Sequence, residues 1–222
     1  MPRIARAVAM GYPHHIIQRG NNRELVFYDE EDKKEYLLLL AKYTEKWSCV
    51  VMAYCLMSNH VHLLVKPSMK ESLYKMMQGI TLCYSQYANR KYGRSGRLWE
   101  SRYHSCIVDR EKYLWAIARY IEQNPVRAGM VKKAEEYAYS SARAHVKGTI
   151  DRVLGEELFS CEHRKDYIQL LRTGLKEDEM EAIRYHARSG RPFGEAVFVK
   201  NMERKLKRPL SRRPKGRPKK GC

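Results

Sequence analysis

The chain has 222 residues, and its 43 lysines and arginines exceed its 25 acidic residues to give a net charge of +18, which points to a polyanionic partner. No apolar run approaches the ~20 residues that span a bilayer, and residues 1–6 lack the apolar core of a signal peptide. We therefore expect a cytoplasmic protein that binds nucleic acid and does not bind a membrane. The six cysteines form no Cys-x-x-Cys pair, which favours reduced thiols over a zinc site or a disulfide framework.

The chain begins with a strand, a helix and a second strand. Residues 14–19 read as the first strand, residues 29–47 as an amphipathic helix with Asp29 as its N-cap, and residues 49–57 as the second strand. The polar pair at 58–59 stands between two apolar runs. It therefore predicts a tight hairpin into the next strand.

The strand that follows the hairpin carries two histidines separated by one apolar residue. Successive side chains of a strand point to opposite faces, so His60 and His62 project side by side. Two imidazoles suit a divalent cation and leave positions open for a third ligand, water and substrate oxygens. A metal-free pair with satisfied hydrogen bonds is the alternative. The adjacent His14 and His15 point to opposite faces, which makes them poor joint ligands.

A second helix and a last strand complete the pattern. Residues 72–92 have apolar side chains at spacings of three and four and end at Gly93, and residues 98–108 read as a strand. Two helices against a four-stranded antiparallel sheet give an α+β fold of the ferredoxin-like or RNA-recognition-motif-like type.

A helix that carries a tyrosine follows the cap-like Asp109 and is expected to stop at Pro125, because the α conformation is disfavoured before proline. Tyr120 and Asn124 stand one turn apart on one face. A phenol is a weak nucleophile unless charge polarises its target, which a cation on a phosphate would do. Tyr120 is therefore the candidate nucleophile. The alternative is that Tyr120 is an ordinary aromatic residue of an amphipathic helix. Tyr113 is the rival candidate for the nucleophile.

Five motifs in this order resemble those of the REP-associated tyrosine transposases, a branch of the HUH single-tyrosine transposases. The motifs are residues 11–23 (GYPHHIIQRGNNR), 53–64 (AYCLMSNHVHLL), 96–102 (GRLWESR), 119–129 (RYIEQNPVRAG) and 139–145 (YSSARAH). The resemblance implies that His60, His62 and Asn124 hold Mg²⁺ or Mn²⁺ and that Tyr120 is the catalytic nucleophile. It also implies the same fold, with the histidine strand facing the tyrosine helix across a shallow, solvent-open groove.

The activity implied by the resemblance is cleavage and rejoining of single-stranded DNA beside hairpins of repetitive extragenic palindromes, through a 5′-phosphotyrosine intermediate. Such a protein would be nucleoid-associated in a bacterium and act as a monomer or a homodimer. Arg97, Arg102 and Arg119 are candidates for phosphate contacts, because guanidinium binds phosphate bidentately. The alternative function is non-catalytic binding of structured single-stranded nucleic acid, which would not need the set of histidines, tyrosine and carboxamide.

The chain is expected to have three parts: a transposase-like domain at 1–147, a helical extension at 148–206 and a basic tail at 207–222. Residues 131–147 read as irregular. In the extension, helices at 177–187 and 195–206 around a break at 189–192 predict a helix-turn-helix, and a plain pair of short helices without that role is the alternative. The tail resembles an AT-hook, in which Arg213 and Arg217 would enter an A·T minor groove. A tail that only screens phosphates is the alternative.

Overall fold

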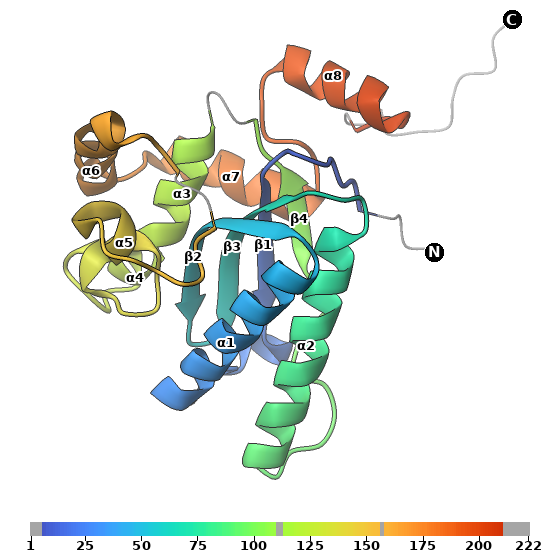
Figure 1. The fold of residues 1–222 in the computed structure, drawn as a ribbon, viewed down its shortest axis with the longest axis vertical. Coiled ribbons are helices and arrows are strands. Elements are labelled where there is room, and N and C mark those ends of the chain that lie inside the picture. Colours follow the sequence, from blue (N-terminus) through green and yellow to red (C-terminus); the bar gives the residue numbers. More distant parts are fainter. Residues whose placement is uncertain (1–5, 110–112, 156–157, 211–222) are drawn as a thin grey trace, which may run out of the picture.

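The structure is a computed structural model that describes residues 6–109, 113–155 and 158–210. Its first elements are β1 (His14–Arg19), α1 (Glu30–Lys46), β2 (Cys49–Met57), β3 (His60–Pro67), α2 (Ser72–Lys91), β4 (His104–Ile107) and α3 (Leu114–Glu122). The strands form one antiparallel sheet in the order β2-β3-β1-β4, and α1 and α2 lie side by side on one face of it (Figure 1). The predicted ferredoxin-like α+β fold is therefore confirmed.

The central strands β1 and β3 divide their side chains between the two faces of the sheet. Ile17 lies opposite His62 and Arg19 lies opposite His60, so these four side chains share one face. The other face packs under α1 and α2. Its fully buried side chains include Ile16, Val61, Leu63 and Val65. Met57 pairs with His60 across the two-residue turn at 58–59, as the sequence predicts.

The last strand is shorter than the sequence predicts, because residues 98–100 pair with the end of β1 and the loop after it instead. Gly20, just after β1, forms an isolated bridge with Trp99, and the Asn21 amide donates to the Leu98 carbonyl. These contacts bend the chain before β4, so the strand begins only at His104.

Two helical segments also differ from the prediction. The chain does not leave the helical conformation at Pro125: a short helix, α4 (Asn124–Arg127), follows α3 and holds this proline in its first turn, where no amide hydrogen is needed. Residues 131–147 are not wholly irregular, since a short 3₁₀ turn and α5 (Ala142–Lys147) form there. Gly148, at φ 69°, ends α5 in the left-handed conformation.

The C-terminal part adds α6 (Arg164–Thr173), α7 (Glu177–Ser189) and α8 (Ala196–Leu206), so both helices expected between 177 and 206 are present. Helix α7 lies against β1 and β4 on the sheet face opposite α1 and α2 (Figure 1). The five cysteines of the described residues are free. Within the same residues, no helix is long and apolar enough to cross a membrane.

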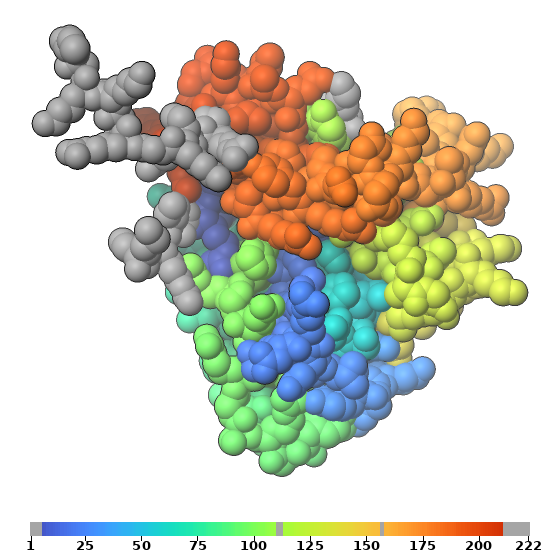
Figure 2. All heavy atoms as spheres, turned by 180° about the vertical axis from the view of Figure 1, so that it is seen from behind, coloured from blue at the N-terminus to red at the C-terminus, as the bar shows by residue number. Residues whose placement is uncertain are grey.

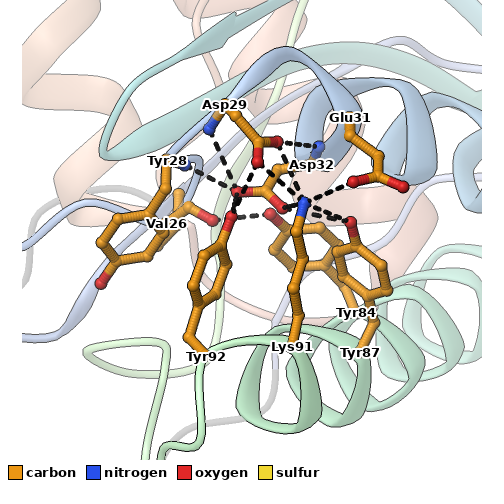
Figure 3. Close-up of polar contacts among 9 residues, drawn as sticks. All are labelled: Val26, Tyr28, Asp29, Glu31, Asp32, Tyr84, Tyr87, Lys91 and Tyr92. Atoms are coloured by element: carbon orange, nitrogen blue, oxygen red, sulfur yellow. Dashed lines mark hydrogen bonds and ion pairs between the residues drawn. The ribbon is translucent and has the colours of Figure 1, made fainter.

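A polar cluster joins the start of α1 to the end of α2. Asp29 caps α1 as predicted. Its Oδ1 accepts the Asp32 amide hydrogen at 3.0 Å, and the Asp29 amide donates to Asp32 Oδ2 at 3.4 Å. From α2, Lys91 Nζ lies 3.0 Å from Asp32 Oδ1, and the hydroxyls of Tyr87 and Tyr92 donate to the same buried carboxylate (Figure 3). The Asp32 carboxylate thus holds the two helices together.

Replacing Asp32 by alanine should lower the free energy of unfolding by about 2 kcal/mol, because half of the capping box is lost and Lys91 and two half-buried tyrosine hydroxyls lose a buried acceptor. Urea denaturation followed by circular dichroism measures the change. Glu31→Ala is the matched control, since Glu31 also pairs with Lys91 but its side chain is 74% exposed, and it should cost less than about 0.5 kcal/mol. Equal losses in the two variants would contradict this account.

Candidate active site

The two histidines of β3 lie side by side on the sheet face that α1 and α2 leave free. Their ring centroids are 5.0 Å apart. His60 Nδ1 lies 2.6 Å from Asn59 Oδ1, and His62 Nδ1 lies 3.1 Å from His15 Nε2. Because Nδ1 of each ring is engaged, Nε2 is the nitrogen that each histidine can offer to a ligand.

Both imidazoles are neutral near pH 7. Burial, together with the charge of Arg19, lowers the pKa of His60 to about 4. Burial and the neighbouring imidazoles of His60 and His15 hold the pKa of His62 well below its ordinary value. A neutral imidazole is the form that binds a metal ion. No group of three or more His, Cys, Asp or Glu side chains suited to a metal exists within the described residues, so this pair would need carboxamide, water or phosphate oxygens as further ligands.

His15 is a site residue that the sequence argument missed. It does point away from His14, as expected, but the antiparallel pairing of β1 with β3 brings it to the face of His62. The two rings stack with centroids 5.4 Å apart and planes 19° apart. This contact depends on the register of β1 against β3. The positions of His14 and His15 in the sequence do not give that register.

Tyr120, on α3, meets the histidines edge-on. Its ring centroid lies 5.6 Å from that of His62 and 5.8 Å from that of His15. The prediction of a solvent-open groove is wrong at this point, because Tyr120 is only 6% exposed and His62 is only 3% exposed. Helix α7 contributes to this burial, since its Arg184 lies beside Tyr120, which helps to raise the pKa of the guanidinium. The rival tyrosine, Tyr113, lies at the start of α3 and packs against Phe193, with ring centroids 4.6 Å apart.

A buried carboxylate holds the tyrosine helix in place. Glu122, also on α3, is fully buried, and its Oε1 accepts hydrogen bonds from Ser141 and His145, each at 2.5 Å. Its Oε2 accepts the Tyr167 hydroxyl of α6 at 2.8 Å. The Ser141 hydroxyl also bonds to the Tyr54 backbone of β2. Glu122 therefore ties α3 to the sheet, to α5 and to α6, which fixes the position of Tyr120.

Asn124 begins the short helix α4, one turn after Tyr120. Its Nδ2 donates to the carbonyls of Tyr120 and Ile121 at 2.9 and 3.1 Å, which caps the end of α3. Its Oδ1 is the atom that it could offer to a cation. A role for Asn124 as metal ligand stays a prediction.

The arginines predicted to contact phosphate lie in different environments. Arg97 and Arg102 are exposed in the segment before β4. Arg119 is 8% exposed, and its guanidinium donates to the Gly174 carbonyl inside the protein. Sequence reasoning missed Arg127, whose Cζ lies 4.6 Å from the Tyr120 ring centroid and whose Nη2 donates to the Tyr120 carbonyl at 2.6 Å. Arg213 and Arg217 lie outside the described residues, and the proposed AT-hook stays a prediction.

Comparisons with known proteins give matches over this part of the chain. The model of the family described as "Transposase IS200 like" matches residues 9–124, which include the histidines, Tyr120 and Asn124. A Haemophilus influenzae protein assigned as a REP-associated tyrosine transposase is 26% identical over 145 residues, which cover 61% of this chain and 80% of that protein. The solved structure of a REP-associated tyrosine transposase bound to a REP hairpin shares the fold, with a TM-score of 0.53 and 16% identity over 72% of this chain and 94% of the other. These matches agree with the resemblance inferred from the motifs.

His14 gives the stability of the fold a pH dependence. Its ring is fully buried, with Nδ1 2.8 Å from the Tyr12 carbonyl and Nε2 accepting the Ala9 amide hydrogen at 3.2 Å, and burial lowers its pKa to about 4. Below pH ~6.5 the unfolded chain binds a proton here that the folded chain does not. The stability contributed by neutral His14 is therefore complete above pH ~6.5 and declines as the pH falls toward the folded pKa.

Because of His14, we expect the free energy of unfolding to be about 2 kcal/mol lower at pH 5 than at pH 7.5. Urea unfolding at both pH values should show a smaller loss for His14→Gln than for the unchanged protein. His163→Gln, at an exposed position, is the matched control and should keep the full pH dependence. An identical loss in all three proteins would rule out His14 as a contributor.

Proposed function

This chain belongs to the family of IS200-like transposases and is a tyrosine transposase, and from this premise we propose that it cuts and rejoins single-stranded DNA through a covalent link to Tyr120. The observation that carries the proposal is the edge contact of the Tyr120 ring with His62, whose neighbour in the site is His60. A protein that only binds nucleic acid has no need for a phenol against a pair of neutral imidazoles.

In the proposed reaction, the phenolic oxygen of Tyr120 loses its proton to water and attacks the scissile phosphorus. The bond from phosphorus to Tyr120 forms as the bond to the 3′ oxygen breaks, and this oxygen takes a proton from water and leaves as a 3′-hydroxyl. The phosphotyrosine link conserves the bond energy, so a later attack by a 3′-hydroxyl can rejoin the strand. The guanidiniums of Arg127 and Arg184 adjoin Tyr120 and would stabilise negative charge on its oxygen.

The donor set fits a divalent cation such as Mg²⁺ or Mn²⁺. His60 and His62 each have Nδ1 engaged and Nε2 left for a ligand, and Asn124 Oδ1 would complete the protein's contribution. A bound cation would polarise the scissile phosphate and neutralise charge on the leaving oxygen. His15 would hold the tautomer of His62 that keeps Nε2 unprotonated, because its Nε2 accepts the Nδ1 hydrogen of His62 in that state.

We propose a DNA hairpin as the structured part of the substrate. The support is the solved relative, which is bound to a REP hairpin, together with the net charge of +18. Exposed Arg97 and Arg102 would contact hairpin phosphates. A chromosomal hairpin as substrate would place the protein at the nucleoid.

Tyr120→Phe should abolish cleavage and the covalent adduct while leaving hairpin affinity within a few-fold, because only the phenolic oxygen is removed. Denaturing gels of labelled hairpin with a single-stranded flank, in Mn²⁺, report both products. Tyr113→Phe is the matched control, because it removes the hydroxyl of the tyrosine at the other end of the same helix, and it should cleave normally. Cleavage by Tyr120→Phe would refute the assignment.

Loss of one imidazole should reveal the metal dependence. His62→Ala removes one of few protein ligands, so cleavage should fall by at least about a hundred-fold, and excess chelator should reproduce the loss in the unchanged protein. The exposed His163→Ala serves as control and should cleave normally. Full activity in excess EDTA would show that these histidines act without a metal ion.

A further inference from the structure

Helix α7 carries a basic and aromatic surface beside the active site, although it lies beyond the residues that the family model matches. Ile183 and Ala187 are buried against the sheet side. Tyr185 and Arg188 lie on the outer side, where Tyr185 is 48% exposed and Arg188 is exposed as well, and half-buried Arg184 lies one turn before Arg188 at the edge of this side. We call these three side chains the α7 surface.

Arg184 links the α7 surface to the nucleophile. Its guanidinium lies beside Tyr120, and its Nη1 donates to Glu177 Oε1 at 2.7 Å, which fixes its direction. The side chain is still 39% exposed. A guanidinium has five donors in a rigid fork, so Arg184 can keep both partners and bind a phosphate oxygen as well.

Tyr185 offers a flat ring that is held in place. The guanidinium of Arg191, in the loop after α7, is hydrogen bonded to the Tyr185 hydroxyl, and its Cζ lies 5.7 Å from the ring centroid. An exposed aromatic ring beside arginines is the combination with which proteins bind single strands, because any base can stack on the ring while cations neutralise the phosphates.

We propose that the α7 surface binds the single-stranded DNA that adjoins the cleavage site, with Arg184 and Arg188 on phosphates and Tyr185 stacked on a base. The strand would thereby be led to Tyr120. Seen from behind, α7 runs in orange across the molecule, over the sheet face where it packs against β4 and β1 (Figure 2). This inference rests on the proposed function, since it takes Tyr120 as the residue that receives the strand.

A helix-turn-helix role for α7 and α8 would instead put this part of the chain on duplex DNA. The structure favours the single strand, because α7 packs on the sheet and its Arg184 lies beside Tyr120, the residue proposed to react with a single strand. Helix α8 packs in a second cluster, in which Met202 is buried with Ile107 and Phe198 lies beside Tyr12.

The test measures binding of a fluorescent oligothymidine to the full-length protein in EDTA, where cleavage is suppressed. Tyr185→Leu should weaken binding about five-fold or more, as the loss of one stacked base does. Arg188→Gln should weaken binding and reduce the slope of log affinity against log salt by about 0.7, the value for one single-strand phosphate. Tyr74→Leu and Arg90→Gln are matched controls on α2, across the sheet, where Tyr74 is 51% exposed and Arg90 is exposed, and each should stay within about two-fold.

Unchanged affinity in both Tyr185→Leu and Arg188→Gln would overturn the inference. So would a loss that is confined to duplex DNA, which would indicate a helix-turn-helix. These outcomes are independent of catalysis: a protein that never forms a Tyr120 adduct would fail the proposed function and yet can still pass this binding test. A protein that cleaves through Tyr120 and binds oligothymidine equally well in all variants would disprove only the role of the α7 surface.

Discussion

The antiparallel pairing of β3 with β1 is the constraint on which the whole site depends. It sets Ile17 opposite His62 and Arg19 opposite His60, which fixes the face that both histidines occupy. A slip of one residue would turn the histidines toward α1 and α2 and expose the apolar residues of the core. The hydrophobic contacts of Val61 and Leu63 with the two-helix layer therefore determine where the imidazoles point. Core packing and site geometry are fixed by the same register.

The tyrosine helix depends on a second constraint, the buried carboxylate of Glu122. A fully buried carboxylate is costly unless its oxygens are hydrogen bonded, and three donors, from Ser141, His145 and Tyr167, meet this need. Because Tyr167 belongs to α6, the C-terminal extension is part of the scaffold that supports Tyr120. With Arg184 on α7, the extension also reaches the proposed nucleophile. The extension and the sheet thus form one structural unit.

Features that depend on neighbouring residues in the chain could be predicted from the sequence. Strand alternation identified His60 and His62, and the capping pattern located the start of α1 at Asp29. Features that depend on distant residues could not be predicted. The contact of His15 with His62 follows from strand register, and the burial of Arg119 against the Gly174 carbonyl follows from the position of α6 and α7. The shortened β4 likewise results from a loop that pairs with Trp99, about eighty residues after Gly20.

The most direct test of the central claim is mass spectrometry of the peptide that becomes linked to DNA. Trypsin would cut after Arg119 and Arg127, so Tyr120 and its rival Tyr113 fall in different peptides, 120–127 and 113–119. After reaction with a hairpin that carries a single-stranded flank, followed by nuclease digestion, the account predicts a nucleotide mass on Tyr120 in peptide 120–127. A nucleotide on Tyr113, or on any residue outside that peptide, would contradict it.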